Sequence, residues 1–222
     1  MTEAIRVAIL EDHQAIIDGY LYRLSGVADI QVGAVLMYGD ALEPALQRQP
    51  ADVLLVDVGV PAAPDNPNPF PILHLIPRLL EKYPDLAVLV ISMHNQRTLV
   101  QALREAGASG YILKDDRTAM LELAAIIRLV HNGGIYFSQA VAKLLKAAPA
   151  EGEGLLTARQ AEVLSYCAAH PEIGTAQLAL RLNIAASTVR NLLSGAYLRL
   201  DVPNRTAAVA RARQLGLITP EL

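Results

Sequence analysis

The sequence has a single cysteine, no long uninterrupted apolar run and no internal repeat. Cys167 has no second thiol with which to form an internal disulfide, and its neighbours Tyr166 and Ala168 are typical of a buried helix. Charged residues interrupt every apolar run before it reaches the roughly 20 residues that a membrane helix needs. The first residues hold no basic and apolar signal segment. We therefore expect a soluble cytoplasmic protein that does not enter a membrane.

The 222 residues carry a net charge of −3, with opposite signs in two parts of the chain. Residues 1–130 hold 10 basic and 16 acidic side chains, a net charge of −6. Residues 155–222 hold seven arginines and four acids, a net charge of +3. This asymmetry predicts two domains with different tasks, of which only the second suits a polyanion.

Apolar runs alternate with helical patterns in the first part of the chain. The pattern predicts strands at 5–10, 30–36, 52–57, 86–92 and 110–113. It predicts helices at 13–25, 40–48, 71–83, 96–107 and 117–132. Five such units indicate an α/β doubly wound five-stranded parallel sheet with the flavodoxin-like strand order 2-1-3-4-5.

The second part has no strand pattern and predicts a small all-α domain. A helix stop at Asn132-Gly133-Gly134 precedes a short predicted helix at 138–147 and a flexible stretch rich in glycine, alanine and glutamate. Four further helices are predicted at 157–170, 174–182, 186–200 and 204–215. The predicted domains are therefore 1–132, a linker with a short helix at 133–154, and 155–222.

Polar side chains follow four of the predicted strands. Glu11 and Asp12 follow the first, and Asp57, Ser92 and Lys114 follow or end three others. Because ligands bind at the carboxyl ends of parallel strands, we expect these side chains to converge. Ionised carboxylates this close repel one another, and a hard cation such as Mg²⁺ relieves the repulsion. Asp57 is then free to attack a phosphoryl group, with Lys114 and Ser92 stabilising the charge on its oxygens.

Each of these side chains also has an ordinary structural explanation. A lone aspartate at a strand end is usually a turn former, and Glu11 and Asp12 can cap the helix that follows. A lysine beside Asp115 and Asp116 is usually a solvated charge, and Tyr111 is expected to face the core whatever the function. The joint occurrence of these residues, in order, at successive strand ends is what favours phosphoryl chemistry.

The segments from Ile9 to His13 and from Gly107 to Lys114, with Asp57 between them, resemble the receiver domains of bacterial two-component response regulators. The resemblance covers about residues 4–132. It implies that a sensor histidine kinase phosphorylates Asp57.

The resemblance also implies roles for the residues around Asp57. Lys114 would pair with the phosphoryl group, Ser92 would move toward it, and Tyr111 would turn inward as a packing switch. The implied Mg²⁺ ligands are Glu11, Asp12, Asp57 and the backbone carbonyl of Gly59.

Five prolines between residues 61 and 71 exclude a helix and predict a loop directly after Asp57. The loop is longer than the turn usual in receiver domains and lacks its glycine. One interpretation is a tolerated surface insertion. The other is a stiff lid that changes phosphorylation, dephosphorylation or kinase docking. His94 is also predicted to face the site.

The predicted helices at 174–182 and 186–200 each bury one apolar side. The side chains that this leaves outward on the second helix are Ser187, Arg190, Asn191 and Ser194. Arginine can read guanine and asparagine can read adenine in the major groove of DNA. The residues predicted to contact phosphates are Thr188, Arg199 and Arg205.

Three blocks of the second part, 156–164, 187–191 and 204–209, resemble the LuxR-type helix-turn-helix. The resemblance implies that the fourth helix, near 204–215, mediates dimerisation on DNA. The chain departs from the usual pattern at Ala185, Leu192, Gly195 and Ala196. A small helical protein-binding domain is the alternative interpretation.

The whole chain thus resembles the NarL/FixJ-type two-component response regulators. This implies a cytoplasmic transcription regulator, homodimeric when active, in which Mg²⁺-dependent phosphorylation shifts binding to double-stranded DNA. One alternative is an atypical receiver that regulates DNA binding without phosphorylation. Another is a Mg²⁺-dependent phosphatase, but haloacid-dehalogenase-like phosphatases carry a second aspartate where this chain has Gly59. We therefore do not expect a metabolic enzyme.

Overall fold

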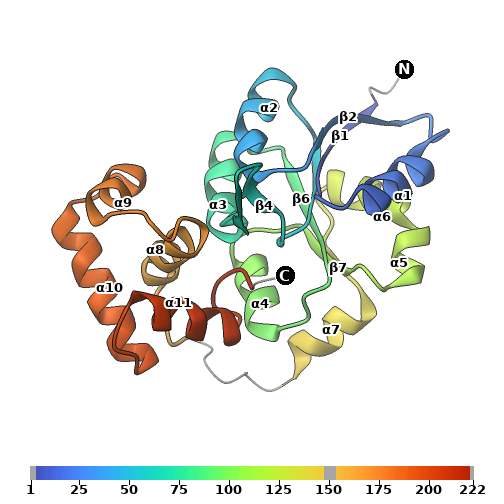
Figure 1. Cartoon of the computed structure of the whole chain (residues 1–222). Coiled ribbons are helices and arrows are strands. Elements are labelled where there is room, and N and C mark those ends of the chain that lie inside the picture. The colour runs from blue at the N-terminus through green and yellow to red at the C-terminus, as the bar shows by residue number, and fades with distance from the viewer. Residues whose placement is uncertain (1–3, 148–153, 221–222) are drawn as a thin grey trace.

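The computed structural model describes residues 4–147 and 154–220, and it shows a sheet with helices on both faces beside a smaller helical unit (Figure 1). The sheet is parallel, with strand order β2-β1-β3-β6-β7-β8. Its strands are β1 Ile5–Leu10, β2 Ile30–Leu36, β3 Val53–Val56, β6 Ala87–Ser92, β7 Gly110–Leu113 and β8 Tyr136–Phe137. The predicted fold class and the order of the five predicted strands are confirmed.

The sheet has one strand more than we predicted. Strand β8 pairs with β7 through Gly110 and Tyr111, and it lies in the segment predicted as a linker. Only two residues long, β8 has no apolar run from which a strand could be predicted. Together with helix α7 (Gln139–Lys146), it extends the sheet by one more βα unit.

Seven helices and one 3-10 helix cover the described part of the sheet domain. Helices α1 (Gln14–Leu24), α5 (Arg117–Leu121) and α6 (Leu123–His131) share a core on one face. The helices whose buried side chains share the other core are α2 (Leu42–Arg48), α3 (Ile72–Lys82), α4 (Arg97–Glu105) and α7. The 3-10 helix η1 (Gly39–Ala41) precedes α2. The helix predicted at 117–132 is two helices, because Glu122, at φ −95° and ψ 12°, leaves the helical region.

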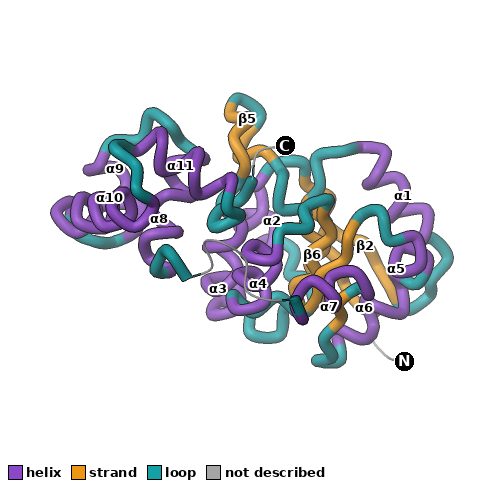
Figure 2. The backbone as a smooth tube through the Cα atoms, turned by 90° about the horizontal axis from the view of Figure 1, so that it is seen from below, coloured by secondary structure: helices purple, strands orange, loops and turns teal. Residues whose placement is uncertain are grey.

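The proline-rich segment predicted as a loop forms a hairpin instead. Strand β4 (Pro61–Ala63) pairs antiparallel with β5 (Asn66–Pro69), and Pro64 and Asp65 make the turn. Proline is tolerated here because each strand has only one partner, so a missing N–H can face away from the pairing. Figure 2 shows β5 standing clear of the main sheet.

The smaller unit contains helices α8 (Ala158–Ala169), α9 (Thr175–Leu182), α10 (Ala186–Leu200) and α11 (Arg205–Gln214) around a separate apolar core. Thr157 and Gln160 form the predicted capping box at the start of α8. Asn183 and Asp201 adopt left-handed backbone angles where α9 and α10 end. Among the described residues, no helix combines the length and apolar character needed to span a bilayer.

Candidate functional site

The carboxyl ends of β1, β3, β6 and β7 bring four polar side chains to one rim of the sheet. The ladder of backbone hydrogen bonds continues beyond the strands, with the Asp57 amide donating to the Leu10 carbonyl at 2.9 Å. The Lys114 amide likewise donates to the Ser92 carbonyl at 3.0 Å. Glu11 follows β1 in the same way, so the backbone pairing fixes where each side chain starts.

The Lys114 ammonium lies between two carboxylates. Its Nζ is 2.7 Å from Asp57 Oδ2 and 2.8 Å from Glu11 Oε2. The side chains of Lys114, Glu11 and Asp57 are 8%, 1% and 4% exposed. Two buried carboxylates thus share one ammonium, which leaves a surplus of negative charge in a site of low polarity.

The pKa values reflect this arrangement. Burial raises the pKa of Glu11, although the hydrogen bond and charge of Lys114 oppose the increase. Burial alone would lower the pKa of Lys114, but the carboxylates of Asp57 and Glu11 outweigh it and raise that pKa. Lys114 therefore stays charged at neutral pH, and a second cation beside Glu11 would favour the ionised carboxylate.

Asp12 and His13 lie at the mouth of the site. The His13 Nδ1 atom is 2.9 Å from Asp12 Oδ1 and 3.3 Å from Glu11 Oε1. Potential ligand atoms of Glu11, Asp12 and His13 all lie within 4.8 Å of one another. The carboxylate of Asp57 is not part of this group and is directed toward Lys114 instead. His13 was not among the predicted site residues, although it follows Asp12 directly in the sequence.

The donor set of this site suits a hard divalent cation. Carboxylate oxygens from Glu11 and Asp12, with Asp57 beside them, are the ligands that Mg²⁺ prefers. The predicted role of Gly59 concerns its carbonyl, but the contact that the structure shows is made by its amide. That N–H donates to Asp57 Oδ1 at 3.3 Å and helps to hold the carboxylate in place.

Hydrogen bonds link the buried Ser92 and Tyr111 through the half-buried His94 next to Asp57. Ser92 is fully buried, and its Oγ accepts a hydrogen bond from the His94 amide at 3.4 Å. The Tyr111 hydroxyl donates to the His94 carbonyl at 2.6 Å, and its ring is 1% exposed. Burial raises the pKa of Tyr111 and lowers that of His94. The inward position of Tyr111 is the one expected of it, and its role as a switch stays a prediction.

The second predicted site lies on α10, the helix of the smaller unit that is farthest from the sheet (Figure 1). The predicted DNA-contacting side chains that are exposed are Ser187, Thr188, Arg190, Asn191, Ser194 and Arg199. Arg205 differs from them because it is half-buried. It donates to the Ile173 carbonyl at 2.7 Å, and the exposed Arg199 donates to the Leu155 carbonyl at 3.3 Å. The structure thus gives Arg205 a role within the helical unit.

Two departures from the usual helix-turn-helix pattern have physical explanations. Ala185 at the start of α10 makes no side-chain cap, because a methyl group cannot accept a hydrogen bond from the first amides of the helix. Gly195 faces the capping box of α8, where an added Cβ would lie 2.7 Å from the Gln160 amide nitrogen. A side chain at this position would have to displace Gln160, so the glycine permits close approach of α8 and α10.

Comparison with known protein families gives two matches. Residues 7–126 match the response regulator receiver domain, and residues 154–212 match the bacterial regulatory proteins of the luxR family. The transcriptional regulatory protein DesR of Bacillus subtilis is 30% identical over 217 residues, covering 96% of this chain and 98% of DesR. The transcriptional regulatory protein DegU of Brevibacillus brevis is 26% identical over 239 residues, covering 96% of this chain and 95% of DegU.

Solved structures show the same fold. The RcsB response regulator of Salmonella typhimurium superposes with a TM-score of 0.57 at 22% sequence identity, covering 94% of this chain and 98% of the other. A structure described as two RcsB dimers bound to two parallel DNAs gives a TM-score of 0.58 with the same identity and coverage.

Proposed function

We propose, because this chain belongs to the response regulators that join a receiver domain to a luxR-type domain, that it binds DNA under the control of phosphorylation at Asp57. The observation that carries the proposal is the buried meeting of Asp57, Glu11 and Lys114 at adjoining strand ends. The proposed domains are a receiver at 1–132, a linker with a short helix at 133–154, and a DNA-binding domain at 155–222.

The phosphoryl donor in this proposal is a phosphohistidine of a sensor histidine kinase. An oxygen of Asp57 attacks the phosphorus atom, so that an O–P bond forms while the N–P bond to histidine breaks. Lys114 turns its ammonium from the carboxylate to the phosphoryl oxygens. The Ser92 hydroxyl moves toward the same oxygens and donates a hydrogen bond to them.

Glu11, Asp12, Asp57 and the Gly59 carbonyl would hold Mg²⁺. The ion, when bound, would neutralise charge on the phosphoryl oxygens. Two buried carboxylates, those of Glu11 and Asp57, share the single ammonium of Lys114, and this excess of negative charge supports the assignment. His13 would hold Asp12 through the contact between Nδ1 and Oδ1.

The output in this proposal is transcription control by a homodimer on double-stranded DNA, in the cytoplasm. The luxR-family match over 154–212 and the exposed polar side chains of α10 support it. The RcsB structure, whose description names dimers on DNA, supports the homodimer. We propose a regulator that catalyses no metabolic reaction.

Replacing Asp57 with asparagine tests the proposal. We expect Asp57→Asn to abolish uptake of labelled phosphate from a small acyl phosphate in the presence of Mg²⁺, because the amide is not a nucleophile. Asp65→Asn, at the exposed turn of the hairpin, is the matched control and should take up phosphate like the unchanged protein. Persistent uptake by Asp57→Asn would show that the acceptor lies elsewhere.

The hairpin after Asp57 favours a second candidate function, in which contacts between the two domains regulate DNA binding without phosphorylation. The observation behind it is that Asn66, at the hairpin, contacts the helical unit. The two candidates differ in one measurement. Equal DNA affinity with and without an acyl phosphate and Mg²⁺ would favour the second, and a shift in affinity would favour the first.

A further inference from the structure

The proline-rich hairpin, residues 60–70, is fixed to the receiver domain at its base. The Phe70 amide donates to the Val60 carbonyl at 2.8 Å and closes the two strands. The Phe70 ring packs directly on Gly39 of η1, where an added Cβ would clash with the ring. Because proline fixes φ, the strands have few alternative conformations. The hairpin is therefore a stiff projection with a defined direction.

Asn66 near the tip of the hairpin is oriented by its neighbour. Its Oδ1 accepts from the Asn68 amide at 3.2 Å and from Asn68 Nδ2 at 2.8 Å. This arrangement turns the Asn66 amide nitrogen toward α8. That nitrogen donates to the Ala169 carbonyl at 2.8 Å and lies 3.2 Å from His170 Nδ1. Ala169 is the last residue of α8, where carbonyls lack partners within the helix.

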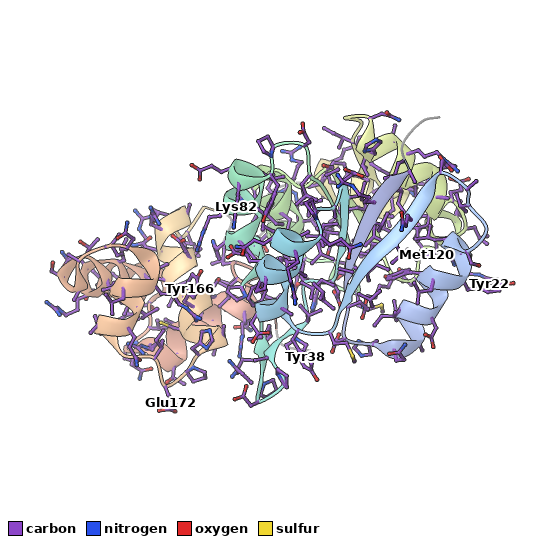
Figure 3. The ribbon with its side chains drawn as sticks, turned by 90° about the horizontal axis from the view of Figure 1, so that it is seen from above. Tyr22, Tyr38, Lys82, Met120, Tyr166 and Glu172 are labelled. Carbon is purple, nitrogen blue, oxygen red and sulfur yellow. The ribbon has the colours of Figure 1, made fainter. Side chains whose placement is uncertain are left out.

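Polar groups of both domains also meet beside this contact. A cavity of about 390 Å³ separates the base of the hairpin from α8 and is lined by groups from both domains. The acidic and arginine side chains that line it are Asp40, Glu43 and Arg78 from the receiver and Arg181 from the helical unit. Tyr166 of α8, on the side of the helical unit that faces the receiver (Figure 3), borders this cavity. Its hydroxyl accepts a hydrogen bond from Arg78 of α3 at 3.5 Å.

A second contact of the same chemical kind lies on α4. The Thr98 hydroxyl donates to the Leu215 carbonyl at 2.6 Å, and Thr98 is 6% exposed. Leu215 follows α11, so this carbonyl also belongs to a helix C-terminus. The next residue, Gly216, has φ +67°, and an added Cβ there would clash with the Thr98 hydroxyl.

We propose that the hairpin is a docking element whose partner is the DNA-binding domain of the same chain. Asn66 and Thr98 clasp that domain by donating hydrogen bonds to the C-terminal carbonyls of α8 and α11. Helix α10 lies on the opposite side of the domain, so the clasp leaves its exposed face uncovered (Figures 1 and 2). The clasp thus sets the position of α10 relative to the receiver. This proposal concerns the free protein and does not depend on the chemistry of Asp57.

Nuclear magnetic relaxation of the full chain tests the clasp. If it holds, the backbone amides of both domains share one rotational correlation time. Asn66→Asp keeps the side-chain shape but places an acceptor opposite the Ala169 carbonyl, and Thr98→Val removes the second donor. Removing each hydrogen bond lowers the docking equilibrium constant roughly fivefold. In the double variant, the correlation time of residues 155–220 should fall below that of the receiver.

Asp65→Asn and Thr118→Val are the matched controls, because both side chains are exposed and lie outside the clasp. The control chain should keep one correlation time. Well-dispersed amide signals from both domains show that the double variant is folded. The proposal is overturned if the unchanged protein already shows two correlation times, or if the folded double variant still shows one.

Discussion

Gly216 combines two restraints at one residue. Its φ of +67° lies in the left-handed region, and its Cα faces the Thr98 hydroxyl without room for a side chain. Gly133 has a similar φ of +80°, but an added Cβ there would meet nothing within 4 Å. The pair therefore separates the effect of backbone strain from the effect of close approach between domains.

We expect Gly133→Ala to lower the free energy of unfolding by about 1 kcal/mol, because alanine is strained at positive φ. Gly216→Ala should lower it further, since the new methyl group also displaces Thr98. Urea unfolding followed by circular dichroism measures both. Equal losses in the two variants would mean that the domains do not meet at Gly216 in solution.

His74 of α3 gives the protein a pH-dependent stability. It lines a cavity between the two domains, and burial lowers its pKa to about 4 from an ordinary value of 6.5. Between these values the folded state binds fewer protons than the unfolded state, so the free energy of unfolding falls as pH falls. The free energy of unfolding is therefore not reduced by His74 above about pH 6.5, and the reduction grows as the pH falls toward 4.

We expect acidification from pH 7 to pH 5 to cost about 1–2 kcal/mol through His74 alone. His74→Leu should remove this part of the pH dependence, because leucine has no proton to bind. Urea titrations at the two pH values measure the difference. His131→Leu, at an exposed position on α6, is the control. If His74→Leu keeps the full pH dependence, His74 is not buried in its neutral form.

Among the helices and strands, the strands were the most predictable elements. Strands β1, β3, β6 and β7 are largely apolar and buried, because helices cover both faces of the sheet, and each ends at or just before a polar residue. The polar residues at these ends could be predicted to converge for the same reason. Strand β2, at the edge of the sheet, instead alternates half-buried and exposed positions after Ile30. Helix ends with a local signal, such as Thr157 and Gln160, were predictable as well.

The elements that were missed lack such local signals. Prolines in β4 and β5 argue against strands when read locally, and the two residues of β8 are too few for a pattern. The contact between Asn66 and Ala169 joins residues 103 positions apart, so no sequence spacing indicates it. The bond from Arg205 to the Ile173 carbonyl was not predictable either, since it depends on how α11 packs.

Arg190 on helix α10 tests the proposed DNA-binding surface. It is exposed on the outer face of the helix, where it can read a base in the major groove. We expect Arg190→Ala to weaken binding to a duplex selected from random-sequence DNA by about 1–3 kcal/mol. Fluorescence anisotropy measures the affinity, and Arg23→Ala on α1 is a control from the receiver domain. Unchanged affinity would remove Arg190 from the proposed interface.

The two parts of the whole molecule have net charges of opposite sign, −6 for residues 1–130 and +3 for residues 155–222. Helix α10, which carries Arg190 and Arg199 of the positive part, lies away from the receiver (Figure 1). The acidic receiver therefore lies behind the proposed DNA-binding surface and not beside it. Because charges are screened over about 8 Å at physiological salt, the acidic receiver in this position repels DNA only weakly.

Salt dependence tests this view of the whole chain. We expect the logarithm of the DNA-binding constant to fall linearly with the logarithm of salt concentration, because binding to phosphates releases counterions. Arg199→Ala should make the slope shallower by about 0.9 for each phosphate that the arginine no longer neutralises. Anisotropy titrations at several salt concentrations give both slopes. If the two slopes are equal, Arg199 binds no phosphate.

The prolines of the hairpin also bear on how copies of this protein meet one another. A two-stranded ribbon has two open edges, and each would normally offer N–H groups to a strand from another molecule. Pro61, Pro67 and Pro69 lie within the two strands and have no N–H to offer. The hairpin can therefore project from the domain without becoming a template for aggregation.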